Sequence, residues 1–308
     1  MRFLAVLLLS LSAGSSAAAP EPGQCPRQGN WLQVLGSGGP EVEDRRASTS
    51  YLIWIDGKAR LLVDAGGGSA LRFGEAGAEV KTLDAVVFSH FHVDHSADFP
   101  VLVKSSFFEG READLPVLGP DGNRFLPSTR EFLQRLFDAD QGVWPYLSHF
   151  LPGQRHFAYE LQPMDIASDS DELRKVWENE RMSLSAVRAH HGPLPALSWR
   201  VDLKQGGSVS FSGDMSGRYG NLPRLAKNSD LLVAHHAIAE ETTGVGRLLH
   251  MPPSLIGQFA AEAGARRLLL SHRMLRSLGH EEESRSLIEK SYSGEIVFTN
   301  DLDCFPIP

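Results

Sequence analysis

The chain contains the stretch Ser89-His90-Phe91-His92-Val93-Asp94-His95, directly after an apolar run over residues 85–88 that predicts a strand. Histidines two residues apart at a strand end can project toward one point, while Asp94 and His95 can reach a second point nearby. Zinc favours imidazole nitrogen and carboxylate oxygen, and a catalytic zinc keeps one position for water. The spacing therefore predicts two neighbouring metal sites. A surface histidine cluster or a closed single-zinc site is the alternative.

Short apolar runs on both sides of this stretch are typical of strands. They cover residues 31–35, 51–55, 61–63, 208–211, 231–233, 268–270 and 296–298. Apolar residues at helical spacing, with stop signals at Gly264 and Gly294, predict helices over residues 255–263 and 281–292, and a third is expected over 128–138. Strands dominate the opening and alternate with helices late in the chain, which favours one α/β domain.

The stretch over residues 89–95 resembles the hallmark H-x-H-x-D-H of the metallo-β-lactamase superfamily, which follows a strand in that family. Asp64-Ala65-Gly66, at the end of the 61–63 run, is similar to the family's early D-x-G element. The resemblance extends over residues 31–300. It implies an α/β fold, the four-layer αββα sandwich of that superfamily, in a single domain.

The resemblance also implies the remaining metal ligands. His190 and His191 are both candidates for the third histidine of the first metal, and we choose His191 because relatives carry this ligand shortly before an aromatic-Arg strand, here Trp199-Arg200. Asp214 matches the aspartate that bridges the two metals, and His272 matches the last histidine. The implied set is His90, His92 and His191 on one metal, Asp94, His95 and His272 on the other, and Asp214 between them.

These ligand types imply two Zn²⁺ ions as cofactors, with Mn²⁺ or Fe²⁺ left open. The family chemistry is attack by a metal-bound hydroxide on a phosphorus, sulfur or carbonyl centre. Asp94 would orient the water or take its proton. His250 is the candidate that protonates the leaving oxygen or contacts the anion, and a supporting hydrogen bond is its alternative role.

Two matched positions argue against neighbouring activities of the superfamily. The subclasses that hydrolyse β-lactams generally lack the bridging aspartate, so Asp214 disfavours antibiotic hydrolysis. Di-iron relatives that reduce oxygen usually place glutamate where His92 stands, so redox chemistry is disfavoured too. Hydrolysis of another kind of ester is therefore expected.

Three elements look like the ribonuclease Z branch and its phosphodiesterase and arylsulfatase relatives: residues 35–40, Leu118-Gly119-Pro120, and His250 before a helix. Ribonuclease Z itself carries H-E-A-T-like residues where this chain has Ala234-His235-His236-Ala237, so its carboxylate–histidine relay is not expected here. The branch implies a hydrolase of phosphodiester or sulfate esters. The alternatives are a lactone or other carboxylic ester hydrolase, and a metal-binding protein without turnover.

Composition limits the class of protein and its partners. The chain has 308 residues, of which 42% are apolar and 22% charged, which excludes a disordered or fibrous protein. Its formal net charge is −8, and a chain this acidic is not expected to carry the broad basic surface of a general nucleic-acid binder. We therefore expect a small-molecule anionic ester as substrate and no general nucleic-acid binding. No long apolar run follows residue 20, so the mature chain is expected to have no membrane span.

The two ends of the chain predict export. Arg2, a short apolar stretch and an A-x-A site ending at Ala19 are typical of a signal peptide over residues 1–19, which leaves a secreted or periplasmic hydrolase domain over 20–308. In an oxidising compartment the two cysteines, Cys25 and Cys304, are expected to form a disulfide, with two free thiols as the alternative.

An aromatic-rich excursion around residues 121–183 interrupts the strand pattern. It carries Trp144, Tyr146, Phe150, Phe157 and Tyr159. Such excursions often form lids or pocket walls, but for any one of these aromatic residues we favour a satellite hydrophobic cluster under a long loop.

Overall fold

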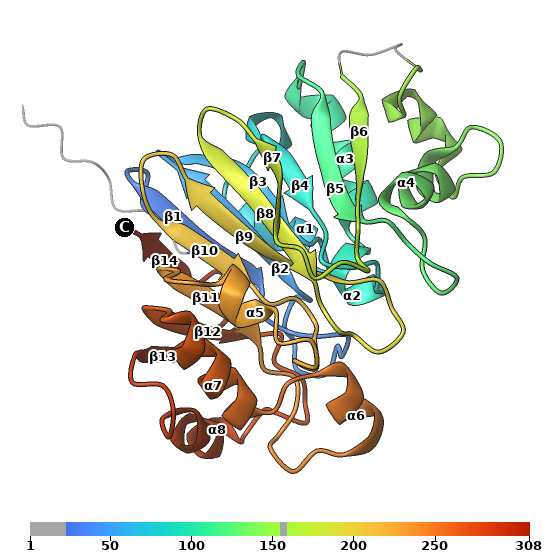
Figure 1. The fold of residues 1–308 in the computed structure, drawn as a ribbon. Helices are drawn as coiled ribbons and strands as arrows, with labels where there is room; N and C mark the ends of the chain where they lie inside the picture. The colour runs from blue at the N-terminus through green and yellow to red at the C-terminus, as the bar shows by residue number, and fades with distance from the viewer. Residues whose placement is uncertain (1–22, 155–158) are drawn as a thin grey trace, which may run out of the picture.

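The computed structural model describes residues 23–154 and 159–308, which form two β-sheets packed face to face with helices on both outer sides (Figure 1). The first sheet contains, in spatial order, β14 (Cys304–Ile307), β1 (Asn30–Gly36), β2 (Ser50–Ile55), β3 (Lys58–Val63), β4 (Ala85–Val87), β5 (Leu115–Pro120) and β6 (Leu161–Ile166). The second contains β13 (Glu295–Phe298), β12 (Arg267–Ser271), β11 (Leu231–His235), β10 (Ser208–Phe211), β9 (Leu197–Leu203), β8 (Met182–Arg188) and β7 (Arg174–Glu178). This is the αββα sandwich that the family resemblance implied.

Helices cover the outer face of each sheet. Those on the side of the first sheet are α1 (Ser69–Glu75), α3 (Phe99–Glu109) and α4 (Thr129–Phe137), with the 3-10 turns η1 (Val80–Thr82) and η2 (Pro145–Phe150). Those on the side of the second sheet are α5 (Leu222–Leu225), α7 (Pro253–Ala263) and α8 (Glu281–Ile288). Two short helices, α2 (Val93–Ser96) and α6 (Gly244–Leu249), lie in the loops at one end of the sandwich.

The direction of the strands decides where loop residues gather. Strands β3 to β6 pair in parallel in the first sheet, and β10 to β13 pair in parallel in the second. The carboxyl ends of neighbouring parallel strands lie at one edge of a sheet, and ligand sites of α/β proteins form at that edge. Residues that directly follow β4, β10 and β12 are thereby brought together.

Three apolar clusters hold the layers together. The central cluster lies between the sheets and includes Ile53, Trp199 and Val233, all fully buried. One outer cluster packs the first sheet against α3 and α4, and the other packs the second sheet against α5, α7 and α8. Because both faces of each sheet are covered, the central strands read as continuous apolar runs, which is why the sequence revealed them.

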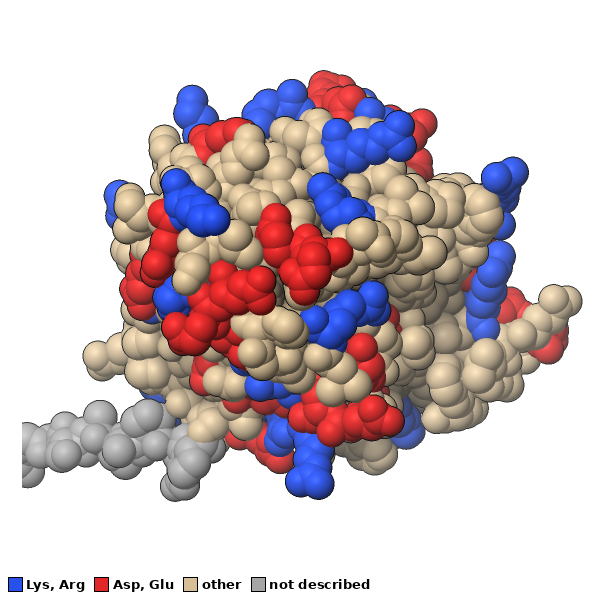
Figure 2. Space-filling model, turned by 90° about the horizontal axis from the view of Figure 1, so that it is seen from below, with Lys and Arg blue, Asp and Glu red and all other residues tan. Residues whose placement is uncertain are grey.

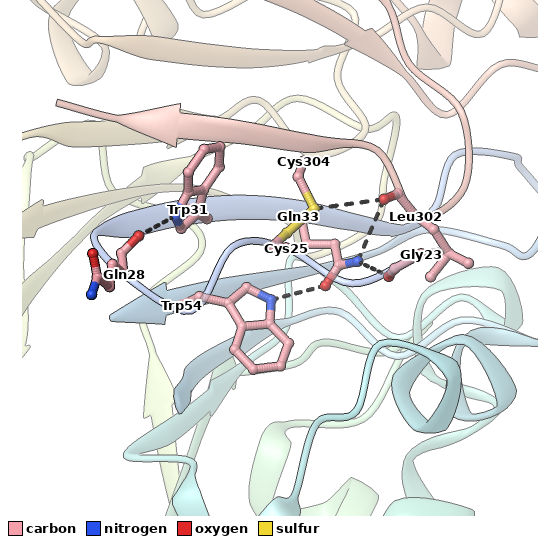
Figure 3. The surroundings of a disulfide bond; sticks show 8 residues. All are labelled: Gly23, Cys25, Gln28, Trp31, Gln33, Trp54, Leu302 and Cys304. Atoms are coloured by element: carbon pink, nitrogen blue, oxygen red, sulfur yellow. Dashed lines mark hydrogen bonds between the residues drawn. A yellow bond between two sulfur atoms is a disulfide. The ribbon is translucent and has the colours of Figure 1, made fainter. Parts of the chain in front are cut away.

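A disulfide joins the two ends of the described chain, as expected from the sequence (Figure 3). Cys25 precedes β1 and Cys304 opens β14, which pairs antiparallel with β1. The Gln33 amide beside it donates to the Gly23 carbonyl at 2.7 Å and accepts from the Trp54 indole N–H at 2.9 Å. The segment before β1 is thus fixed to the sheet by the disulfide and by the hydrogen bond from Gln33 to Gly23.

The structure confirms the expected strands and shows others that the sequence analysis did not predict. β5 contains Pro116 and Pro120, and β6 contains Pro163, residues that normally argue against a strand. The helix expected over residues 281–292 ends at Ile288, because the chain turns there and the Tyr292 hydroxyl donates to the Ala265 carbonyl at 3.0 Å.

The aromatic-rich excursion packs mainly into the core. Phe150 and Tyr159 are buried in the cluster outside the first sheet, and Trp144 packs against it, whereas Tyr146 is exposed. The same segment supplies β6 and β7, which form one edge of each sheet. Phe157 and the expected signal peptide lie outside the described residues. Within the described ranges, no helix combines the length and apolar character needed to cross a bilayer.

Candidate metal centre

Seven side chains expected to bind metal lie where strands of the two sheets end. From the first sheet come His90, His92, Asp94 and His95, which follow β4; from the second come His191 after β8, Asp214 after β10 and His272 after β12. Figure 1 shows α2, which begins inside the motif, at the end of the sandwich where α6 also lies. The site therefore spans the boundary between the sheets.

The first group of ligands surrounds one oxygen of Asp214. His90, His92, His191 and Asp214 each offer an atom within 4.8 Å of the others. The Nε2 atoms of His90 and His191 lie 4.0 Å and 3.6 Å from Asp214 Oδ2. His92 is the most solvent-accessible of the four. This is a three-histidine set with a carboxylate, a combination that suits zinc.

The second group surrounds Asp214 from the other side. Asp94, His95 and His272 also offer atoms within 4.8 Å of one another. His272 Nε2 lies 3.3 Å from Asp94 Oδ2 and 3.2 Å from Asp214 Oδ1. His95 Nε2 lies 3.6 Å from Asp94 Oδ2 and 3.6 Å from Asp214 Oδ2. Asp214 therefore faces both groups, as a bridging ligand would.

The buried nitrogens of these histidines fit a cation. Nε2 of His90, His95, His191 and His272 is buried and has no hydrogen-bond partner among the described residues. A buried polar atom without a partner costs about 1–3 kcal/mol, so four of them around one carboxylate need an explanation. Coordination of metal ions by these nitrogens would supply it.

Asp64, from the D-x-G element, orients the motif. Its carboxylate accepts hydrogen bonds from His95 Nδ1 at 2.9 Å, from the Ser89 backbone N–H at 2.7 Å and from the Ser89 hydroxyl at 2.8 Å. This fixes His95 with Nε2 toward the centre. Gly66 is required because a Cβ there would lie 2.1 Å from the Asp94 carbonyl oxygen. Asp64 and His272 both adopt positive φ, 57° and 51°, and such local strain is common at functional sites.

The pKa shifts of the clustered histidines indicate which of them carry an extra proton when no cation is bound. Burial lowers the pKa of His90 well below its usual range. Although burial opposes the effect, the carboxylates of Asp214 and Asp94 raise the pKa of His272 to about 10. The pKa of His95 is also raised, against the effect of its burial, mainly by Asp94 and Asp64. A cation entering the second group would therefore displace protons from His95 and His272, which makes its affinity depend on pH.

The structure separates His191 from its neighbour His190. His191 points its Nε2 into the first group while its Nδ1 donates to the Leu249 carbonyl at 3.1 Å. His190 points away, hydrogen-bonds to the Ser216 hydroxyl at 2.6 Å and packs edge-on against Tyr219. Successive residues of an extended chain face opposite sides, so only one of the two can join the cluster.

His250, the candidate acid, lies beside the centre without belonging to either ligand group. Its Nδ1 is 4.0 Å from Asp214 Oδ1, and its ring is 5.4 Å from that of His191 and 5.7 Å from that of His272. Burial lowers its pKa to about 3 in this arrangement. The ring is thus close enough to reach a bound anion or leaving group.

The two histidines that replace the H-E pair point in different directions. His235 hydrogen-bonds to Asp214 Oδ1 through Nδ1 at 2.7 Å, a contact that the sequence analysis missed. His236 turns away from the centre, hydrogen-bonds to the Ser284 hydroxyl at 2.8 Å and lies against Phe298. Neither residue supplies a carboxylate in place of the glutamate, and His235 contacts the carboxylate of Asp214 instead. The adjacent histidines at the end of a predicted strand were the one available signal for His235.

Protonation of His236 is expected to destabilise the fold as the pH falls. Burial lowers its pKa to about 4 in the folded state, below the unfolded value of about 6.5. As the pH falls, the unfolded state therefore takes up the proton first. The contribution of neutral His236 to the free energy of unfolding is complete above pH 6.5 and is lost between pH 6.5 and pH 4. Between pH 7 and pH 5 we expect metal-free protein to lose about 2 kcal/mol more than His236→Gln does, measured by urea unfolding. His280→Gln, at an exposed histidine, is the control and should behave like wild type; equal losses in all three proteins would contradict the prediction.

Comparison with known proteins agrees with this geometry. A family model described as "Beta-lactamase superfamily domain" matches residues 59–273. Curated ribonuclease Z proteins are similar over most of their length. The one from Mycolicibacterium paratuberculosis is 28% identical over 88% of this chain and 96% of its own, and the one from Thermobifida fusca is 28% identical over 90% and 94%.

Solved structures share the fold. The metallo-beta-lactamase fold protein YhfI from Bacillus subtilis has a TM-score of 0.69 at 21% identity, over 90% of this chain and 98% of that one. The short form of human tRNase Z has a TM-score of 0.69 at 18% identity, over 90% and 99%.

These relatives correct the expectation about partners. A small-molecule ester substrate and the absence of nucleic-acid binding were inferred from the net charge, but the curated relatives are ribonucleases, which by name act on RNA. Net charge sums over the whole chain and does not describe one face. Figure 2, which looks at the sandwich from below the view of Figure 1, shows Lys and Arg side chains interspersed among acidic ones. The charge of −8 therefore does not exclude an RNA substrate.

The match of the family model extends from β3 to just beyond His272 and includes every residue of the two ligand groups. It covers more than half of the chain, and the fold and the clustered histidines agree with it independently. The chain therefore belongs to the β-lactamase superfamily, as one of its metal-dependent hydrolases with the metallo-β-lactamase fold.

Proposed function

We propose that this protein hydrolyses phosphodiester bonds in RNA, as an enzyme of the ribonuclease Z and phosphodiesterase type that works with two zinc ions. One observation carries the proposal: six potential ligands from both sheets gather around the shared carboxylate of Asp214. The ribonuclease Z relatives support the class of bond. Nitrogen and oxygen ligands support zinc over softer metals.

The ligand sets would hold one cation each. His90, His92 and His191 would bind the first, Asp94, His95 and His272 the second, and Asp214 both. Two bound cations supply Lewis acidity, which lowers the pKa of water from 15.7 toward about 7 and offsets the charge of the phosphate. Asp64 and the Leu249 carbonyl would keep the histidine rings turned toward them.

Two side chains would handle protons. Asp94 Oδ2 lies 3.6 Å from His95 Nε2 and 3.3 Å from His272 Nε2, and this carboxylate can orient the attacking water or accept its proton. His250 Nδ1 lies 4.0 Å from Asp214 Oδ1, where the neutral ring can donate a hydrogen bond to the phosphate. Burial lowers its pKa to about 3, so it can protonate the leaving oxygen only when the negative charge of the bound phosphate raises that pKa. These are the roles that a two-carboxylate, five-histidine site offers to ester hydrolysis.

Export forms part of the proposal. The signal-like N-terminus and the disulfide between Cys25 and Cys304 support an oxidising compartment outside the cytoplasm, with residues 20–308 as the mature single domain. Amino-terminal sequencing of protein from the secreted or periplasmic fraction tests this assignment. A mature chain that begins at Pro20 is expected, and intact Met1 in a cytoplasmic fraction would contradict it.

A substrate panel tests the reaction. Zinc-reconstituted protein is expected to cleave a short RNA and a nitrophenyl phosphodiester, and to leave a lactone and a β-lactam intact; a sulfate ester measures how strictly the site requires phosphorus. Asp214→Ala, purified in parallel, controls for contaminating nuclease. Efficient opening of the lactone with both phosphodiesters untouched would replace the proposal by carboxylic ester hydrolysis. Full metal binding without turnover of any substrate would make the protein a metal-binding protein.

Replacing His250 separates its two roles. His250→Ala is expected to retain both metals and to slow hydrolysis by about 10²–10⁴-fold if His250 is the acid. In that case the reduction in rate is smaller for a substrate with a nitrophenyl leaving group, which needs little protonation, than for one with an alkyl leaving group. Hydrolysis rates on the two phosphodiesters, together with zinc content by elemental analysis, distinguish the roles. Equal losses with metal intact would make His250 a positioning residue, and loss of metal would make it structural.

A further inference from the structure

A chain of two hydrogen bonds runs from the first sheet to Asp214. Tyr51 lies in β2 and His235 ends β11, and the three side chains are 1%, 2% and 3% exposed in the order Tyr51, His235, Asp214. Tyr51 Oη lies 3.1 Å from His235 Nε2, and His235 Nδ1 lies 2.7 Å from Asp214 Oδ1. His235 thereby connects the first sheet to the carboxylate shared by both ligand groups.

The chemistry of the three groups fixes the direction of both bonds. An ionised carboxylate only accepts, so His235 Nδ1 carries a proton and donates it to Asp214 Oδ1. The other nitrogen of a neutral imidazole then accepts, and the Tyr51 hydroxyl donates to it. Burial raises the pKa of the Tyr51 phenol well above its usual value, which keeps that proton in place. Every donor thus has an acceptor.

The register of the second sheet places His235 between two metal ligands. β11 lies between β10, which leads to Asp214, and β12, which leads to His272; His235 pairs with Ser271, the neighbour of His272. Atoms of Asp214, His235 and His272 come within 4.8 Å of one another, so His235 is close enough to bind a cation itself. Its two hydrogen bonds occupy both ring nitrogens and exclude it from that role.

We propose that Tyr51 and His235 are positioning residues that set the orientation of the bridging carboxylate. With His235 on Oδ1, Asp214 is held so that Oδ2 faces His90, His95 and His191 while Oδ1 faces His272. Tyr51 acts through His235, because its hydroxyl prevents the ring from flipping its donor away from Asp214. The inference rests on the proposed function, since it assigns Asp214 to both cations.

Zinc affinity of the full chain tests the role of Tyr51. Tyr51→Phe is expected to weaken zinc binding about 10- to 100-fold in a titration against a chromogenic chelator, the usual effect of removing a group that orients a metal ligand. Tyr292→Phe is the matched control, because Tyr292 is also buried and its hydroxyl donates to the Ala265 carbonyl. The control should bind zinc as wild type does. Thermal unfolding of the metal-free proteins shows whether both variants fold.

A double-mutant cycle tests whether Tyr51 acts through His235. His235→Ala is expected to weaken zinc binding at least as much as Tyr51→Phe, and adding Tyr51→Phe to it should cause no further loss. His235→Asn, which keeps an amide donor near the position of Nδ1, should recover part of the affinity. A merely structural tyrosine would instead give effects that multiply, with no rescue by asparagine.

The outcomes separate this inference from the proposed function. If wild type binds two zinc ions and cleaves a phosphodiester, but Tyr51→Phe binds zinc as tightly as Tyr292→Phe, only the inference is overturned. The same holds if the cycle shows independent effects. Wild-type protein that binds no zinc overturns the proposed function and the inference with it.

Discussion

Asp214→Ala is expected to reduce phosphodiester hydrolysis by at least about a thousandfold, which corresponds to about 4 kcal/mol of transition-state stabilisation. The substitution removes the carboxylate that lies within 3.2–4.0 Å of four histidine Nε2 atoms. Without it these nitrogens surround a cavity, and two cations would repel each other with no anion between them. Initial rates on zinc-reconstituted protein give the loss, and elemental analysis gives the metal content, which should fall below two per chain.

Asp202→Ala is the matched control for this variant, because Asp202 lies in β9 as a surface partner of Arg200. Surface ion pairs of this kind contribute about 0–1 kcal/mol, so its activity and metal content should equal those of wild type. Retention of two zinc ions and near-normal turnover by Asp214→Ala would refute the bridged centre. A wild-type stoichiometry that stays at one zinc under saturating metal would do the same.

Removal of the disulfide is expected to lower the free energy of unfolding by about 2–5 kcal/mol. Cys25 and Cys304 are separated by 279 residues, so their bond restricts the unfolded chain over nearly its whole length. The variant Cys25→Ser/Cys304→Ser should therefore unfold at lower denaturant concentration than wild type, as measured by circular dichroism in urea. The loss of stability should appear as a lower midpoint concentration of urea.

Wild-type protein with and without reductant provides the control, since reduction removes the same bond without a substitution. Cys25 precedes β1 and Cys304 opens β14, whereas the motif follows β4, so the folded variant should keep its activity. A double variant that is as stable as oxidised wild type, or two thiols that react with an alkylating agent in the native exported protein, would contradict the assignment.

The clustering of the candidate metal ligands was predictable from the sequence where the ligands are close together in the chain. His90, His92, Asp94 and His95 lie within six residues, and the strand before them fixes their positions. The link from Tyr51 to His235 was not predictable, because these residues are 184 positions apart and meet only when the two sheets pack. A buried tyrosine in an apolar strand carries no sign in the sequence of the partner it will have.

The strands of the fold likewise include some that the sequence predicted and some that it did not. The central strands β10, β11 and β12 are buried on both faces, and β11 and β12 contain the plain apolar runs Leu231–Val233 and Leu268–Leu270. β5 and β6 were missed because their prolines lack a backbone donor and their patterns lack regular alternation. Pairing along the sheet, a tertiary effect, overrides that local preference.

Because the candidate ligands come from both sheets, the order in which folding and metal binding can occur is also constrained. Four ligands follow β4 of the first sheet, and three follow strands of the second, so neither sheet alone carries a complete set for the bridged pair. A cation that arrives before the sheets dock meets only the partial set of the motif. If the protein binds two ions as proposed, their capture would follow docking of the sheets, and the bound ions would then slow the separation of the two sheets.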